Sequence, residues 1–290
     1  MSVASIPSAL ALRPPGRRRR RSPGLRLGVL CALALGANIP VLVVIVNSLK
    51  STAEFLSTNS LFPIHWTVEN YGILGTQTDF ASFVRTSVTV TVLVTAVSVA
   101  VAMLAGYSLS RTWNAFAVGY ARSVLMLQMF PIILELIPLF ILFRYLHLIN
   151  SSLSVVPLYV AGVLPYGIWM AKGFFDGIPR ELEEAAWVDG SSRFAGFWRI
   201  VLPLSGPGLA AIAIFSFLLS WNEFLVASVF LRNPHAETIP VGVFVFVQEY
   251  QTNWGPLFAA SALALIPAFI FVTFAQRYMV QGAIVGSVKG

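Results

Sequence analysis

The stretch EEAAWVDGSSRFAGFWRIVLP, residues 183–203, carries charges and turn residues, yet long apolar runs flank it on both sides. The whole chain of 290 residues is 57% hydrophobic and only 11% charged. Soluble domains are about a quarter charged, so this chain has too few charged side chains to give a globule a polar surface. The flanking runs therefore predict membrane spans, and the stretch itself predicts a structured loop between two of them.

Six apolar runs lie along the chain, each close to the roughly 20 residues that a helix needs to cross a bilayer. They cover residues 27–47, 86–109, 120–143, 153–175, 206–230 and 256–276. Prolines inside several runs indicate kinked helices, because neighbouring helices can satisfy the freed backbone groups. We therefore expect an all-α, polytopic membrane protein with six transmembrane helices.

The basic residues predict the orientation of these spans. If the N-terminus is inside, 15 of the 19 Lys and Arg lie on the inner side, five of them consecutively at 17–21. Cytoplasmic segments are enriched in Lys and Arg, so both termini and the 183–203 loop are expected to be cytoplasmic. The arginine run would anchor the leader beside anionic lipid. This explains the net charge of +7 without nucleic acid as a partner.

Local signals in the charged loop predict two short helices. Three glutamates follow Pro179, and they favour the positive end of a helix dipole. Asp189 and Gly190 give a stop-and-turn signal, after which Ser191 or Ser192 can cap a second helix. Its aromatic residues would share one face at helical spacing: Phe194, Phe197 and Trp198.

This helix–turn–helix has two interpretations. An amphipathic hairpin on the membrane surface would explain its aromatic residues. However, the three glutamates would be repelled by an anionic leaflet. The alternative is a protruding helix pair that docks into a groove on a cytoplasmic partner. This interpretation explains both the aromatic residues and the glutamates, and we favour it.

The order of residues in the loop resembles a known family motif. Glu184-Ala185-Ala186, then Gly190, then Ile200 and Leu202-Pro203 is similar to the EAA loop of bacterial ABC-importer permeases. The segments WNEFL (221–225), TIPVG (238–242) and the tail 281–290 resemble the maltose-type carbohydrate permeases, in the half related to the shorter maltose permease. The resemblance covers about 27–290 and leaves the leader aside.

This resemblance implies the type I ABC importer permease fold, with no chemistry on this chain. The implied organisation is a cytoplasmic basic leader (1–26), a first transmembrane helix (27–47), an extracytoplasmic loop (48–85), a core (86–276) with the EAA loop at 181–203, and a cytoplasmic tail (277–290). The residues implied in coupling to an ATPase are Glu184, Ala185, Ala186, Asp189, Gly190, Phe194, Trp198, Ile200, Leu202 and Pro203.

The resemblance also implies the partners, in a bacterial cell membrane. They are a second homologous permease chain, two ATP-binding subunits, an extracytoplasmic sugar-binding protein that would meet the outer loop 232–254, and membrane lipid. ATP and Mg would bind the partner ATPase. The chain's own residues agree, because Lys50, Lys172 and Lys289 do not follow the glycine-rich turn that a Walker A phosphate loop needs.

Five polar or aromatic residues inside the spans are candidates for the translocation pathway: Gln128, Glu135, Trp221, Asn222 and Glu223. An ionisable group at membrane depth is costly and indicates function. The alternative for Glu135 is an ion pair with Arg144 near the outer boundary. For residues 221–223, hydrogen bonding between helices is favoured over direct contact with sugar.

We therefore expect a permease subunit of an ATP-driven sugar importer. Glycerol phosphate or another polyol is the alternative solute. A self-sufficient secondary transporter would usually carry an internal repeat, which the sequence does not show. A membrane enzyme or metal site would need clustered ligands, but the three histidines are scattered and Cys31 is the sole cysteine. Cys31 excludes an internal disulfide and is expected to be a small buried residue.

Overall fold

The computed structural model describes residues 23–57, 60, 62–112, 115–247 and 252–286. Within these ranges the chain is helical and forms no strand, apart from two isolated β-bridges, Lys50 to Trp66 and Val247 to Thr252. The chain divides into two compact units, 1–43 and 44–290. The predicted arginine run at 17–21 and the last four residues of the tail lie outside the described residues.

Helix α1 (Pro23–Ser48) begins in the first unit. It contains an apolar stretch, Leu27–Ser48, that is long enough to cross a membrane, as the sequence predicts. Every side chain from Leu27 to Val43 is exposed, and Cys31 is exposed with them. The expectation that Cys31 is buried is therefore wrong. A single helix has no neighbour within its own unit to bury it, and lipid can cover such a surface.

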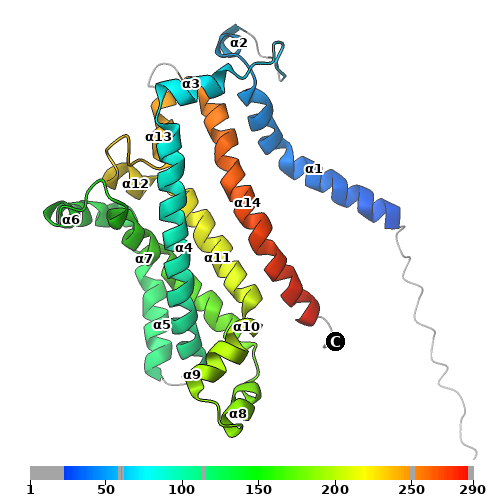
Figure 1. Cartoon of the computed structure of the whole chain (residues 1–290), viewed down its shortest axis with the longest axis vertical. Coiled ribbons are helices and arrows are strands. Elements are labelled where there is room, and N and C mark those ends of the chain that lie inside the picture. Colours follow the sequence, from blue (N-terminus) through cyan, green and yellow to red (C-terminus); the bar gives the residue numbers. More distant parts are fainter. Residues whose placement is uncertain (1–22, 58–59, 61, 113–114, 248–251, 287–290) are drawn as a thin grey trace, which may run out of the picture. The chain divides into compact units, whose positions relative to one another are not determined.

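Four long helices form the bundle of the second unit (Figure 1): α4 (Phe80–Arg111), α7 (Ser152–Asp176), α11 (Gly206–Trp221) and α14 (Trp254–Gly286). Small residues bring α4 and α7 together. A Cβ added at Gly106 would lie 2.5 Å from the Cβ of Ala171 and 2.8 Å from the backbone nitrogen of Lys172. The two backbones thus approach as closely as glycine allows, the usual device of packed membrane helices.

Shorter helices complete the second unit. They are α2 (Thr52–Ser57), α3 (Glu69–Gln77), α5 (Ala115–Leu127), α6 (Ile132–Tyr145), α8 (Glu181–Val188), α9 (Arg193–Gly196), the π-helix η1 (Phe197–Val201), α10 (Leu202–Leu204), α12 (Leu225–Phe230), α13 (Ile239–Gly242) and the 3-10 helix η2 (Val243–Phe246). Helices α2 and α3 occupy one end of this unit, and α8 and α9 occupy the other (Figure 1).

Two predicted spans are not continuous helices. The run 120–143 is divided into α5 and α6 at residues 128–131, where Pro131 lacks an N–H and disfavours helix in the residue before it. The run 206–230 is divided into α11 and α12 at residues 222–224. The predicted second span begins six residues earlier than expected, at Phe80.

Four helices among the described residues are long and apolar enough to cross a membrane. A fifth span is obtained if 193–204 and 206–221 are counted together, although the two helices meet at a 73° bend. In the described part of the second unit, three hydrophobic clusters hold the bundle. The one nearest α8 joins α4, α7, η1 and α11 through Met103, Phe175, Phe197 and Ile212.

Candidate functional site

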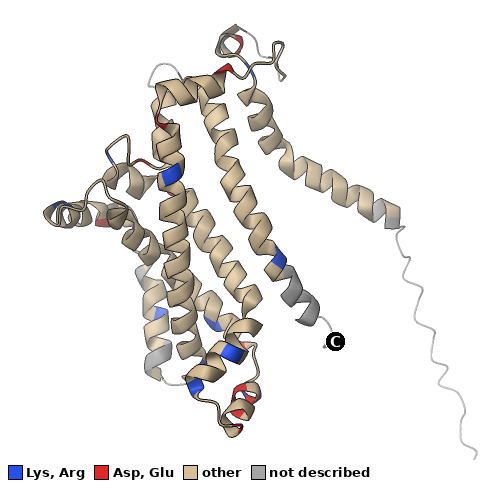
Figure 2. Cartoon of the chain, in the orientation of Figure 1, with Lys and Arg blue, Asp and Glu red and all other residues tan. Residues whose placement is uncertain are grey.

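Charged residues gather at the end of the second unit that carries α8 and α9 (Figure 2). The predicted helix–turn–helix is confirmed there. Helix α8 ends at Val188, and the Ser192 hydroxyl accepts a hydrogen bond from the Ala195 N–H at 3.2 Å, which caps α9. Of the two serines that could serve as the cap, Ser192 is the one used.

Gly190 makes the turn between the two helices. Its φ is +87°, and no atom lies within 4 Å of the Cβ that another residue would carry there. The Gly190 N–H donates to the Trp187 carbonyl at 3.0 Å, and the Ser191 N–H donates to the Ala186 carbonyl at 2.9 Å. This is a Schellman motif, whose left-handed residue is usually glycine. Backbone conformation alone therefore selects glycine at this position.

Helix α8 has an inner and an outer face. Glu183 is only 2% exposed, and Ala186 and Trp187 are half-buried at the i+3 and i+4 positions. Glu184 and Ala185 point outward, and Val188 is 88% exposed. The first two residues of the EAA sequence thus lie on the outer face, and its last alanine lies at the edge.

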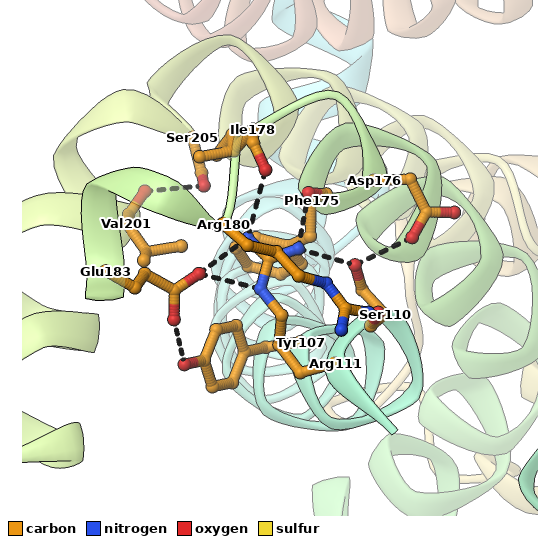
Figure 3. Close-up of polar contacts among 10 residues, drawn as sticks. All are labelled: Tyr107, Ser110, Arg111, Phe175, Asp176, Ile178, Arg180, Glu183, Val201 and Ser205. Atoms are coloured by element: carbon orange, nitrogen blue, oxygen red, sulfur yellow. Dashed lines mark hydrogen bonds and ion pairs between the residues drawn. The ribbon is translucent and has the colours of Figure 1, made fainter. Parts of the chain in front are cut away.

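A buried ion pair fastens the inner face to α4 (Figure 3). Arg111 approaches Glu183 Oε1 through Nη2 at 2.6 Å and through Nε at 2.7 Å. The Tyr107 hydroxyl donates to Glu183 Oε2 at 2.5 Å. Both carboxylate oxygens therefore have charge-assisted or short hydrogen bonds, which is the condition for burying a charge without a large penalty.

Arg111 also joins the end of α7 to the same cluster. Its Nη1 donates to the Phe175 carbonyl at 3.0 Å, and its Nη2 donates to the Ile178 carbonyl at 3.3 Å. Beside it, Ser110 donates to Asp176 at 2.7 Å. An open cleft of about 590 Å³ adjoins these groups, lined by Ser110, Arg111, Asp176, Ile178, Pro179, Arg180 and Glu181. The end of α4, the end of α7 and the start of α8 are thus one hydrogen-bonded block.

The aromatic residues after the turn do not share one face. Phe197 is 5% exposed and packs 4.6 Å from the Tyr107 ring centroid. Phe194 and Trp198 remain exposed, at 72% and 49%. The expectation of a single aromatic face is therefore wrong: Phe194 and Trp198, four residues apart, stay together with ring centroids 5.9 Å apart, whereas Phe197 turns inward at the start of the π-helix η1. Phe194 and Trp198 join the outer face, and Phe197 joins the core.

The remaining predicted coupling residues follow the same division. Asp189 is exposed at the end of α8, and Pro203 is exposed in α10. Ile200 and Leu202 are half-buried. The outer face of this segment, defined as Glu184, Ala185, Val188, Phe194 and Trp198, combines charge with large exposed apolar groups. Exposed apolar groups rimmed by polar residues are typical of surfaces that bind a protein or a membrane.

The candidates for the pathway lie at the two helix breaks. Gln128 is half-buried between α5 and α6, where its Nε2 donates to the Gly162 carbonyl at 2.9 Å. Glu135 is half-buried in the first turn of α6. Among the described residues it forms no ion pair with Arg144.

The other three candidates lie where α11 ends. Trp221 is 6% exposed and stacks on Phe217 with ring centroids 5.5 Å apart, so it packs in the core. Asn222 donates to the Leu218 carbonyl at 2.8 Å. The Glu223 carboxylate accepts from the backbone N–H groups of Val226 and Ala227 at 2.8 and 3.1 Å. These hydrogen bonds join residues three or four positions apart, so they stabilise the end of α11 and the start of α12 locally, whereas the sequence favoured bonds between packed helices.

Tyr107, Arg111 and Glu183 are not among the site residues predicted from the sequence. The helical spacing of Glu183, Ala186 and Trp187 signals an inner face. Arg111 ends an apolar run and offers the matching charge. Only the three-dimensional structure shows that the two side chains meet.

The comparisons with known proteins settle the family. A sequence model described as "Binding-protein-dependent transport system inner membrane component" matches residues 98–285. The chain belongs to this family. It is therefore a multi-pass inner-membrane permease subunit of an ABC importer, without a catalytic role of its own. Family membership therefore excludes the alternative interpretations as a secondary transporter or a membrane enzyme.

Curated relatives are similar over nearly their whole length. The inner membrane ABC transporter permease protein YcjP of Escherichia coli is 32% identical over 91% of this chain and 97% of its own. The diacetylchitobiose uptake system permease protein DasC of Streptomyces coelicolor is 31% identical, over 89% and 94%. The trehalose/maltose transport system permease protein MalG of Thermococcus litoralis is 33% identical, over 89% and 94%.

A solved structure shares the fold. One chain of a bacterial ABC transporter involved in the import of the acidic polysaccharide alginate superposes with a TM-score of 0.73. The alignment covers 92% of this chain and 99% of that chain, at 21% identity. The all-α importer permease fold predicted from the sequence is thus confirmed.

Proposed function

We propose that this permease imports a sugar and that its outer face on α8, α9 and η1 docks on the ATP-binding subunit. The observation that carries the proposal is the outer face itself, which is held rigid from behind by the Arg111–Glu183 ion pair of 2.6 Å. A rigid knob can transmit the movement of a partner into the helices behind it. Those helices are α4 and α7.

The proposed assembly contains a second homologous permease, two ATP-binding subunits and an extracytoplasmic sugar-binding protein. ATP and Mg bind the ATPase subunits. Closure of the ATPase pair moves the docked segment, and the bundle changes from inward to outward access. The distribution of basic residues supports an orientation with both termini and α8 in the cytoplasm, and with α2 and α3 outside.

The first residues of the loop that would meet the binding protein, 232–235, are held by hydrogen bonds to the rest of the chain. Asn150 Oδ1 accepts hydrogen bonds from the backbone N–H groups of Arg232 and Asn233 at 2.6 and 3.0 Å. Ser82 donates to the His235 carbonyl at 2.7 Å. The side chains of Arg232, Asn233 and His235 are exposed. Such a platform suits a partner that docks without reordering the loop.

Sugar is the favoured solute because the names of related permeases contain different sugars. Diacetylchitobiose and trehalose or maltose appear in the names of two of them. A strain lacking this chain should lose uptake of one oligosaccharide and keep uptake of glycerol phosphate. Uptake of radiolabelled solutes measures this, and loss of glycerol phosphate uptake alone would make a polyol the substrate.

The docking role is tested by matched substitutions of two exposed phenylalanines. Phe194→Ser removes an aromatic ring from the outer face. Phe244→Ser removes an aromatic ring from η2, where the side chain is 55% exposed. Truncating a central aromatic residue of an interface costs about 2 kcal/mol or more, roughly a 30-fold loss of affinity. Co-purification of the ATP-binding subunit, and ATPase activity measured without the binding protein, should fall with Phe194→Ser and hold with Phe244→Ser, which lies in the loop proposed to meet the binding protein. Equal behaviour of the two variants would refute the docking role.

A further inference from the structure

A short segment between α2 and α3 exposes an unusual amount of apolar surface. Residues 62–68 read FPIHWTV and contain no Asp, Glu, Lys or Arg. Phe62, Ile64, Trp66 and Val68 are 67%, 59%, 64% and 70% exposed. Four large apolar side chains so close together would be unfavourable in water. We call residues 62–68 the cap strip.

The cap strip is held in place by charged groups that are turned inward. Glu54 is 6% exposed and accepts hydrogen bonds from the backbone N–H groups of Ile64 and His65 at 2.7 and 3.5 Å. The bond from Ile64 helps to hold the pKa of the Glu54 carboxyl below its usual range, against the opposing effect of burial. Lys50 is 2% exposed, and its Nζ donates to the Ser60 carbonyl at 3.0 Å. The charges therefore lie behind the strip, and the apolar side chains lie in front.

The position of the cap strip relative to the spans is also fixed. The first membrane-length apolar stretch ends at Ser48. One residue later, the Leu49 carbonyl accepts a hydrogen bond from the Thr67 N–H at 2.9 Å, beside the bridge between Lys50 and Trp66. The strip is therefore paired with the residues that directly follow a span. This places Trp66 at the depth where a span leaves the membrane.

A second span begins at the same end of the unit. Helix α14 starts at Trp254, which is 46% exposed and stacks on Phe258. Phe55 of α2 stacks on the same Phe258 with ring centroids 5.6 Å apart. Trp and Tyr are enriched where spans meet the membrane–water boundary, because their rings are amphipathic. Trp66 and Trp254 both have this position.

We propose that the cap strip is an interfacial membrane anchor, which inserts Phe62, Ile64, Trp66 and Val68 into the boundary of the lipid bilayer. A lipid surface fits an uncharged, apolar and aromatic patch at a span end. The anchor would hold α2 and α3 at a fixed height on the membrane. The proposal requires only that the spans cross a membrane, so it stands apart from the solute and the ATPase.

Spin labelling tests this in the importer purified through a tag on this chain and reconstituted into lipid nanodiscs. The native Cys31, exposed within the first span, supplies the reference for a site in the membrane. A Cys31→Ala background then carries one new cysteine, Ile64→Cys or Val68→Cys on the strip. Thr76→Cys on the exposed side of α3 is the control. Collision rates are measured with oxygen, which enters lipid, and with a water-soluble nickel chelate.

Labels at 64 and 68 should collide several times more often with oxygen than with the nickel chelate, as the label at Cys31 does. The label at Thr76 should show the reverse preference. A preference for nickel at 64 and 68 would overturn the anchor in favour of a solvated loop. Protection from both reagents would overturn it in favour of a protein partner on the strip.

Discussion

Two adjacent glutamates of α8 have opposite environments. Glu183 is buried against Arg111 and Tyr107, and Glu184 is exposed on the outer face. Replacing Glu183 by Gln leaves the guanidinium of Arg111, only 16% exposed, without its counter-charge. Leaving a buried polar or charged partner unsatisfied costs about 1–3 kcal/mol. Glu183→Gln should therefore lower the melting temperature of the purified complex by several degrees.

The neighbouring substitution Glu184→Gln is the matched control, since it makes the same chemical change one residue away. It should leave the melting temperature unchanged and weaken binding of the ATP-binding subunit. Thermal unfolding and co-purification are measured on the same samples. If Glu183→Gln melts at the wild-type temperature, the ion pair does not stabilise this end of the bundle.

At the scale of helices, local signals predicted the helix–turn–helix of α8 and α9 well. Pro179, the glutamates, Gly190 and Ser192 act through their own backbone neighbourhood, so the sequence specifies them directly. The helix breaks were not predicted, because proline in a membrane helix can either kink it or end it. The outcome depends on distant partners, such as the Gly162 carbonyl that receives Gln128. The buried side of α8 depends on Arg111 in the same way.

The contact between α4 and α7 gives a prediction at this scale. Gly106→Ala would place a Cβ 2.5 Å from Ala171 Cβ and 2.8 Å from a backbone nitrogen. Overpacking of this kind costs about 1–3 kcal/mol, so the melting temperature should fall. At Gly162, inside α7, a Cβ would meet nothing within 4 Å. Gly162→Ala should be neutral or stabilising by up to about 1 kcal/mol.

Both alanine variants are measured by thermal unfolding in the same detergent. A fall in melting temperature for Gly106→Ala alone supports close approach of α4 and α7. If Gly106→Ala and Gly162→Ala melt at the same temperature, α4 and α7 are further apart than in the structure.

For the whole molecule, one feature of the single chain calls for another protein or a water-filled pathway beside it. The break between α5 and α6 is tied through Gln128 to Gly162, which lies near the middle of the membrane-length helix α7. Met129 in this break is 84% exposed. Irregular backbone at membrane depth does not face lipid, since lipid cannot satisfy its N–H and C=O groups. The second permease of the proposed assembly should therefore cover residues 128–131, on the side where the pathway runs.

A photoreactive amino acid at Met129 tests this arrangement in native membranes. On illumination it should form a covalent adduct with the second permease, detected by mass spectrometry. The same amino acid at Val188, which is 88% exposed on the outer face of α8, should instead capture the ATP-binding subunit. An adduct with lipid alone at Met129, or none at all, would mean that the break is not an interface between permeases. Met129 tests the contact with the second permease, and Val188 tests the contact with the ATP-binding subunit. Capture of the ATP-binding subunit at Val188 without capture at Met129 would therefore refute only the permease interface. The reverse result would refute only the docking surface.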